Sequence, residues 1–317
     1  MQKQGYTAVR PLKKRSVWKE WGSDFKKNGG LYLIALPVIL FYILFHYKPM
    51  YGVIIAFKNF SPAKGILDSD WVGFRYFIQF LKDDYFFRLM RNTLTISVTT
   101  LIFSFPMPII LALLLNELRS KVFSRSVQLV AYLPHFISLI VICGLIQKFT
   151  SANGIITQLL THFGGQSTSY LSHPKYFVPI YVISDIWQET GWNSIIYLAA
   201  LTGVDTQLYE AAAIDGAGKW KQTLHVTLPG IMSTIVIMLI LRIGALLSVG
   251  YEKIILLYSP ITYETADVIS TYVYRDGLVQ GNWSYSTAIG LFNSVINFIL
   301  LIIANTLSRK YSESSLW

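Results

Sequence analysis

Residues 210–217 carry the sequence Glu-Ala-Ala-Ala-Ile-Asp-Gly-Ala, and Leu228-Pro229 follows after a short interval. This run of small side chains lies in a polar loop between two hydrophobic segments. Asp205 can cap a short helix over 206–214, because its carboxylate accepts a hydrogen bond from a backbone N–H of the first turn. Gly216 then tolerates the left-handed backbone that ends a helix. The stretch therefore predicts a helix followed by a sharp turn.

A second short helix is expected from Lys219 to about His225. It would lead to Pro229, which is tolerated in the first turn of the next hydrophobic span. The loop 203–229 would then form a compact bent knob with alanines on its surface, and Glu210 could pair with a cation on a partner. An ordinary amphipathic helix at the membrane interface is the alternative, because alanine-rich helices are common. The loop alone does not decide between the two.

The composition is that of a membrane protein. The 317 residues are 53% hydrophobic and 14% charged, with a mean hydropathy of +0.46, whereas soluble domains carry about 25% charged residues. The net charge of +10 does not indicate nucleic acid as a partner, because the basic residues gather at the ends of apolar segments. Cys143 is the single cysteine, so no internal disulfide can form.

Apolar segments predict the fold class, an all-α integral membrane protein with six transmembrane helices. A helix needs about 20 mostly apolar residues to cross the hydrocarbon layer. Six segments are long enough or nearly so: Leu31–Tyr47, Leu94–Leu115, Val127–Phe149, Phe177–Leu201, Ile231–Leu247 and Ala288–Leu307. Residues 31–307 would form one membrane domain between a basic tail, 1–30, and a short tail, 308–317. The end of the first span is the least defined, because His46, Lys48 and Pro49 interrupt it.

The distribution of lysine and arginine predicts that both termini lie in the cytoplasm. With that orientation the inner segments carry 15 of these residues and the outer segments 11. This excess on the inner side agrees with the positive-inside rule. The densest cluster directly precedes the first span. Trp18, Trp21 and Phe25, among lysines, would let the N-terminal tail lie on the inner leaflet.

Three charged residues lie inside predicted spans, where an ionisable group suggests a function. Asp185 and Glu189 are four residues apart on one face of the fourth span, and Arg242 lies well within the fifth. At 1.5 Å per residue, Arg242 is roughly 21 Å from Leu228, and the two acids are roughly 24 and 18 Å from the inner end of their span. We therefore hypothesise that Arg242 pairs with Asp185 or Glu189 beside a translocation path. A purely architectural ion pair is an equal alternative.

Further polar and aromatic residues are candidates for the same path. Asn193 lies near the acidic pair, and the rings of Trp187 and Trp192 could stack on sugar rings. The sixth span carries Asn293 and Asn297 on a polar stripe that would equally serve helix packing. The histidines have no ligand spacing, so no metal site is expected. There is no catalytic constellation and no phosphate-binding loop, since Trp220 follows Gly218-Lys219. The chain itself is expected to bind no cofactor.

The loop resembles a known family. Glu210-Ala211-Ala212, then Gly216, then Val226 and Leu228-Pro229 are similar to the "EAA" loop of binding-protein-dependent ABC importer permeases, in particular the maltose- and oligosaccharide-type branch with a MalF-like core. Arg91-Asn92-Thr93-Leu94 and Trp192-Asn193-Ser194 match as well, and the resemblance covers the chain from about residue 31. Val226 in place of isoleucine and Ser233 in place of a second proline are mild departures.

The resemblance implies a type I importer permease fold (MetI/MalF-like) in a bacterial inner or plasma membrane. It also implies a second homologous permease, two ATP-binding subunits that use ATP and magnesium, and an extracytoplasmic solute-binding protein. The loop would dock into a cleft on an ATPase, and the contacting residues would be Glu210, Ala211, Ala212, Asp215, Gly216 and Ala217. The substrate implied is a carbohydrate, an oligosaccharide, and Arg242 leaves room for an acidic one.

Three rival functions stay open at this point. A permease of the same family could carry another solute, such as a glycerol phosphate. An ion-coupled secondary transporter would use the acidic residues of the fourth span to bind its coupling ion. An intramembrane enzyme would need a catalytic constellation that the sequence does not offer.

Overall fold

The computed structural model describes residues 17–311 and 315–317, with side chains from residue 27 onward, and forms two compact units, 1–54 and 55–317. The first unit is one long helical segment: α1 (Val17–Tyr42), a π-helical turn η1 (Ile43–Tyr47) and α2 (Lys48–Met50), continued by the 3-10 helix η2 (Tyr51–Phe57). Of the predicted N-terminal tail, residues 1–16 and the side chains of Trp18, Trp21 and Phe25 lie outside the described part.

The predicted end of the first span at Tyr47 is wrong. The apolar helical stretch runs from Lys27 to Phe57. Pro49 does not end it, because this proline lies in the first turn of α2, where no backbone N–H is required. The π-helical turn directly before α2 takes up the irregularity. The helix also begins before Leu31, with one non-helical residue at Asn28.

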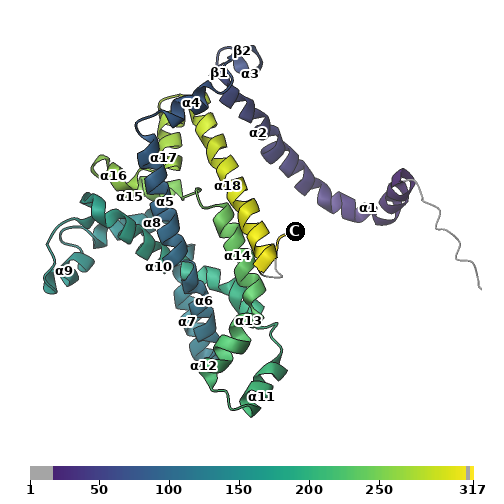
Figure 1. The fold of residues 1–317 in the computed structure, drawn as a ribbon, viewed down its shortest axis with the longest axis vertical. Helices are drawn as coiled ribbons and strands as arrows, with labels where there is room; N and C mark the ends of the chain where they lie inside the picture. The colour runs from purple at the N-terminus through teal and green to yellow at the C-terminus, as the bar shows by residue number, and fades with distance from the viewer. Residues whose placement is uncertain (1–16, 312–314) are drawn as a thin grey trace, which may run out of the picture. The chain divides into compact units, whose positions relative to one another are not determined.

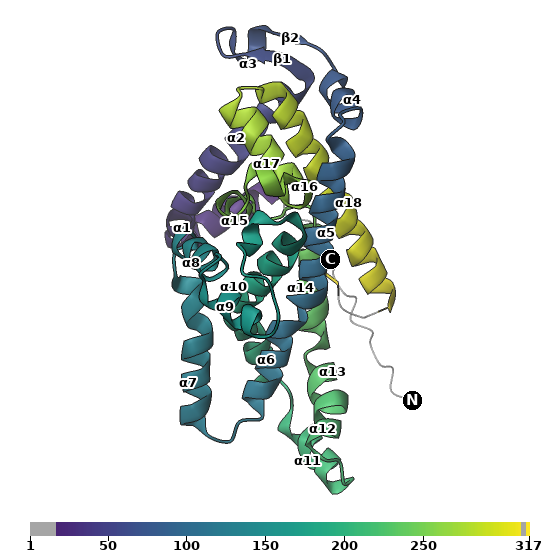
Figure 2. The ribbon, with the colours of Figure 1, turned by 90° about the vertical axis from the view of Figure 1, so that its left-hand side faces the viewer.

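The second unit begins with a small antiparallel sheet of β1 (Lys58–Ser61) and β2 (Ser69–Trp71), with α3 (Gly65–Asp68) between them. The helix α4 (Arg75–Leu81) follows. Figures 1 and 2 show this sheet at one end of the second unit and the helices α11 and α12 at the opposite end. α5 and α6, one after the other, run along the direction between these two ends (Figure 2).

The second predicted span is confirmed as a longer, interrupted helix. α5 (Phe86–Phe103) and α6 (Pro106–Asn116) together make one candidate span from Phe86 to Asn116. Ser104 and Phe105 keep helical backbone angles, and the interruption coincides with Pro106, which has no backbone N–H to donate to the preceding turn. Ser104 and Phe105 both line a cavity described below.

The third predicted span, Val127–Phe149, is not one straight helix. α7 (Lys121–Tyr132) ends in the 3-10 turn η3 (Leu133–Phe136), and α8 (Leu139–Phe149) leaves at an angle of 98°. Pro134 in η3 removes a backbone donor and breaks the helical ladder, and the extended residues Ile137 and Ser138 complete the bend. The short α9 (Ile155–His162) and the 3-10 turn η4 (Tyr170–Ser172) follow.

The fourth predicted span corresponds to α10 (Pro174–Leu201), the central helix of the second unit. The loop after it forms α11 (Thr206–Ile214), α12 (Lys219–Gln222), the π-helical turn η5 (Thr223–Thr227) and α13 (Leu228–Gly230). The fifth span is α14 (Met232–Gly244), and a bend of 60° separates it from the preceding segment. Pro229 therefore lies before the bend at Ile231 and not in the first turn of the span, which corrects the prediction.

The rest of the chain consists of short helices and one long helix. These are α15 (Tyr251–Leu257), η6 (Pro260–Thr262), α16 (Tyr263–Ala266), α17 (Ile269–Val273), η7 (Tyr274–Val279) and α18 (Trp283–Tyr311). The sixth predicted span, Ala288–Leu307, lies within α18. The described residues thus hold three helices long and apolar enough to span a membrane, or up to five if each bent pair is one span. The sequence predicts six spans. This criterion of length and hydropathy gives at most five among the described residues, because α10 is not apolar enough to meet it.

Three apolar clusters hold α10 and its neighbours in place. One joins α5, α8 and α10 to α15 around Phe177, and another joins α6, α10 and α14 around Tyr197 and Ile231. The third joins α4, α5, α17 and α18 around Phe80. Because α10 belongs to two of the clusters, its polar face is fixed relative to α5, α14 and α15.

Candidate functional site: a helical hairpin and a charged cavity

The loop between α10 and α14 forms a helical hairpin, residues 205–227, as predicted for its first half. The Asp205 carboxylate accepts a hydrogen bond of 2.9 Å from the backbone N–H of Gln207, so it caps α11. α11 ends at Ile214, and Gly216 has a φ of +76°. The Ala217 N–H donates to the Ala212 carbonyl oxygen at 2.9 Å, the hydrogen bond of a left-handed helix end. The second half differs, because α12 ends early and continues as a π-helical turn.

The predicted contact residues of the hairpin are mostly accessible. Glu210, Ala211, Asp215 and Gly216 are exposed, and Ala212 and Ala217 are half-buried. Beside them are two large apolar side chains that the sequence analysis did not single out, Ile214 at 86% and Trp220 at 74% exposed. Both side chains are accessible to a partner at this end of the second unit. Their position in a polar loop was the signal that could have identified them.

The hairpin is braced internally. The Gln222 side chain donates to the Ala217 carbonyl oxygen at 2.9 Å, and the Tyr209 hydroxyl donates to Thr227 Oγ1 at 3.0 Å. An ion pair of 3.3 Å joins Lys219 to Glu117, which follows α6. These contacts connect both helices of the hairpin to each other and to a neighbouring loop.

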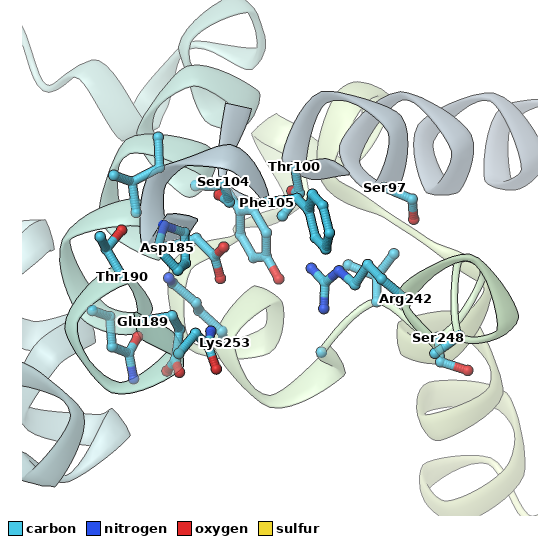
Figure 3. Close-up of a pocket in the computed structure, with 18 of the residues that line it drawn as sticks. Ser97, Thr100, Ser104, Phe105, Asp185, Glu189, Thr190, Arg242, Ser248 and Lys253 are labelled. Atoms are coloured by element: carbon cyan, nitrogen blue, oxygen red, sulfur yellow. The ribbon is translucent and has the colours of Figure 1, made fainter. Parts of the chain in front are cut away.

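A cavity of about 660 Å³ lies between α5, α6, α10, α14 and α15. Figure 3 shows the charged and hydroxyl side chains that line it. Four predicted pathway residues are among the lining residues: Asp185, Glu189, Asn193 and Arg242. The structure therefore brings together the intramembrane charges that the sequence analysis singled out.

The predicted ion pair of Arg242 with Asp185 or Glu189 is absent from the part of the chain that the structure describes. Glu189 instead lies 3.1 Å from His135 Nδ1, at the 3-10 turn that bends the third span. The His135 ring stacks on Trp192 with centroids 4.5 Å apart and planes 3° apart. The bend at Pro134, which the sequence analysis missed, carries His135 to this position.

The cavity is also lined by polar side chains that the sequence analysis did not single out. Lys253 on α15 lines it, with 6% of the residue exposed, and its ammonium lies 5.0 Å from the Tyr181 ring centroid. The hydroxyl oxygens of four lining residues are buried and have no hydrogen-bond partner among the described residues: Ser97, Thr100, Ser104 and Thr190. Serine and threonine are common in membrane helices, so the sequence alone could not single out these four residues. Only the fold shows that they line the cavity.

Four other predicted pathway residues do not line this cavity. Trp187 and Trp192 are 47% and 41% exposed on α10, and Trp192 stacks on His135. Asn297 on α18 accepts from the Leu247 N–H at 2.9 Å and donates to Ser248 Oγ at 2.9 Å, so it fixes the chain that leaves α14. Asn293 lies one turn earlier on α18, with its side-chain oxygen buried and without a partner among the described residues.

Comparison with known proteins identifies the family. Residues 104–313, which span α6 to the end of α18, match the binding-protein-dependent transport system inner membrane component family. The chain belongs to this family. Family membership makes it a membrane component of a transport system, and the hairpin and the cavity are parts of that component.

Relatives cover almost the whole chain. It is 45% identical to Protein LplB of Bacillus subtilis, over 94% of each chain. It is also 45% identical to the polygalacturonan/rhamnogalacturonan transport system permease protein YteP of the same organism, over 90% of each chain. Among solved structures, a chain of the bacterial alginate ABC transporter in complex with its alginate pentasaccharide-bound periplasmic protein is 42% identical, with a TM-score of 0.85. That alignment covers 95% of this chain and 99% of the solved one.

Proposed function

We propose that this family member is one permease subunit of an ATP-driven importer, and that it forms half of the pathway for an acidic oligosaccharide. A second homologous permease would supply the other half of the pathway. Two ATP-binding subunits would hydrolyse ATP, and an extracytoplasmic solute-binding protein would deliver the sugar. In this arrangement the permease has six spans with both termini in the cytoplasm, and α10 and the bent α7–α8 segment each count as one span.

The observation that carries the proposal is that the hairpin connects the two walls of the cavity directly. α10 supplies Asp185, Glu189 and Asn193 to the cavity, and it runs without a break to Leu201, four residues before the cap of α11. At its other end the hairpin passes through α13 into α14, which supplies Arg242. A force applied to the hairpin would therefore shift both walls. This is the connection that an external ATPase needs to open and close a pathway.

The lining of the cavity fits a sugar. The four unpartnered hydroxyls and the side chain of Asn193 can exchange hydrogen bonds with sugar hydroxyls, since each of these groups can both donate and accept. Arg242 and Lys253 supply cations that a carboxylate can approach. Two of the similar proteins support an acidic substrate, because one is named for polygalacturonan and rhamnogalacturonan and the other for alginate.

The test is transport by the reconstituted complex. The permease is purified with its partner permease and ATPases, inserted into liposomes and supplied with its binding protein and trigalacturonate. We expect uptake that requires ATP and the binding protein. The variant Glu210→Lys should abolish uptake and ATPase binding, and the matched control Glu264→Lys, an exchange outside the hairpin, should leave ATPase binding unchanged.

Three results would contradict the proposal. Uptake that a proton or sodium gradient drives without ATPase would favour a secondary transporter. Uptake of glycerol phosphate but of no oligosaccharide would favour the small-solute alternative, which the two cations of the cavity also fit. Equal uptake of an oligosaccharide by wild type and Glu210→Lys would show that transport does not depend on the hairpin.

A further inference from the structure

Lys253 is the most deeply buried charge of the cavity. The residue is 6% exposed, and its ammonium has no hydrogen-bond acceptor within residues 27–311 and 315–317. It lies on α15, a helix of seven residues whose apolar side chains Ile254 and Leu257 are fixed in the cluster around Phe177. The backbone beneath the lysine is therefore anchored. An ammonium carries three donors, and leaving them unsatisfied in a buried site is costly.

The other charges around the cavity do not satisfy these donors. Among the described residues, neither Asp185 nor Glu189 forms an ion pair with the Lys253 ammonium. Glu189 is bound to His135, and Glu252, the third lining acid, is exposed. The face of the Tyr181 ring offers the ammonium a weak attraction at 5.0 Å. The donor positions of the Lys253 ammonium thus stay open among the described residues.

Arg242 is the second cation, but its surroundings differ. It is exposed and lies in the last turn of α14, where the negative end of the helix stabilises a cation. Figure 3 shows Lys253 beside Asp185 and Glu189, with Arg242 on the other side of the view. Of the two cations, Lys253 is the one whose burial calls for an anionic partner.

We propose that Lys253 is a specificity-determining residue, whose ammonium binds a carboxylate of the sugar as it passes through the cavity. Its flexible four-carbon stem lets the ammonium follow a moving carboxylate without a shift of the backbone. The unpartnered hydroxyls of Thr100 and Thr190 belong to the same cavity and would take the sugar hydroxyls. This inference rests on the proposed function, because it names the residue that recognises the acidic group of the proposed substrate.

The experiment compares two probes in the reconstituted complex, trigalacturonate and its fully methyl-esterified form. The ester keeps the sugar hydroxyls but has lost the charge. For Lys253→Gln we expect uptake of trigalacturonate to fall about ten- to a hundredfold, the effect of losing one hydrogen bond to a charged group. Uptake of the ester should stay within about threefold of wild type. Lys253→Arg, which keeps a cation, should restore most of the trigalacturonate uptake, and Lys148→Gln, an exposed lysine on α8, serves as the matched control.

A purely structural role for Lys253 would give a different pattern. Lys253→Gln would then reduce uptake of both probes equally, together with the amount of assembled complex recovered with the ATPases. If Lys253→Gln fails to assemble, the double variant Asp185→Asn/Lys253→Gln, which removes both charges, provides the folded protein for the same comparison. Loss of the preference for the acidic probe in that variant supports the proposal, and an unchanged preference overturns it. Wild-type protein that imports neither probe contradicts the proposed function instead.

Discussion

The Lys219 ammonium of α12 lies 3.3 Å from the Glu117 carboxylate, which directly follows α6. α6 lines the cavity through Pro108, so this ion pair connects the hairpin to a third wall besides the two that are continuous with it. The pair is exposed, with 73% of the Lys219 side chain and 33% of the Glu117 side chain accessible. Its contribution is therefore small and depends on salt.

Charge reversal at this pair should have a modest, reversible effect. Lys219→Glu places two carboxylates together, and an exposed pair contributes about 0.2–1 kcal/mol, which corresponds to at most about a fivefold loss of uptake. The double variant Lys219→Glu/Glu117→Lys should recover wild-type uptake at low salt. The measurement is ATP-driven uptake at two salt concentrations. A double variant as impaired as the single one would show that Lys219 acts on another partner.

Gly216 should contribute in two separate ways. Its backbone conformation forms the turn of the hairpin, and its lack of a side chain leaves room for the ATPase. Its φ of +76° costs a residue with a Cβ about 1–2 kcal/mol, yet no atom of the described residues outside the local backbone lies within 4 Å of an added Cβ. Gly216→Asn should restore the turn better than Gly216→Ala, because asparagine tolerates this region. Protease cleavage at Lys219 and Lys221 reports the turn, and affinity for the ATPase reports the contact. An asparagine variant with an intact turn and normal affinity would show that no partner approaches Gly216 closely.

Arg242 and Asp185 should be energetically independent, in contrast to the pair that the sequence predicts. Because no ion pair joins them, a double-mutant cycle with Arg242→Gln and Asp185→Asn should give a coupling energy below about 0.5 kcal/mol. The cycle of His135→Ala and Glu189→Gln should give about 1 kcal/mol, since these groups are 3.1 Å apart and partly exposed. The measured quantity is the free energy of unfolding in micelles. A larger coupling energy between Arg242 and Asp185 would support the ion pair that the sequence predicts.

Local signals explain what the sequence could predict. The cap at Asp205 and the turn at Gly216 depend on neighbouring residues only, so α11 is correct to the residue. Asp185, Glu189 and Arg242 stand out because each interrupts an apolar segment, and the fold does bring them to one cavity. The distances between them depend on how separate helices pack, and that information is not local.

The features that the sequence analysis missed depend on contacts between residues that are far apart in the sequence. Lys253 looks like a residue of an outer loop, because α15 has seven residues and no periodicity long enough to predict a buried helix. The bend of 98° at η3 depends on Pro134 within an otherwise continuous apolar run, where a proline can also be tolerated without a break. Without that bend His135 could not be placed next to Glu189, and Arg242 remained the only evident partner.

The stability of the second unit should fall at high pH through Tyr272. Its hydroxyl donates to Asp83 Oδ2 at 3.1 Å, and burial, together with the nearby Asp83 and Asp276 carboxylates, raises the pKa of Tyr272 from 10.0 to about 12. The folded state therefore keeps this proton when the unfolded chain loses it. The stabilisation is complete below pH 10 and is lost as the pH rises through about 12. Thermal unfolding of Tyr272→Phe should decline less between these pH values than that of wild type, and Tyr274→Phe, an exposed tyrosine nearby, should follow wild type.

Gly191 should tolerate no side chain, because α7 packs directly against it. A Cβ at this position of α10 would overlap the carbonyl oxygen of Ala131 and come within 2.9 Å of the Tyr132 backbone nitrogen. Both are backbone atoms, so relief requires α7 to move away from α10. Overpacking of this kind costs about 1–3 kcal/mol or more.

We therefore expect Gly191→Ala to lower the thermal unfolding temperature of the purified protein and to reduce uptake. The movement would also displace His135, which follows α7, and thereby weaken its contact with Glu189 at the cavity. Gly290→Ala on α18 is the matched control, since no atom of residues 27–311 outside the local helix backbone lies within 4 Å of a Cβ there and alanine favours a helix by about 0.8–1.0 kcal/mol over glycine. It should leave the unfolding temperature unchanged or raise it. Equal effects of the two exchanges would mean that α7 and α10 are less closely packed than the contact at Ala131 indicates.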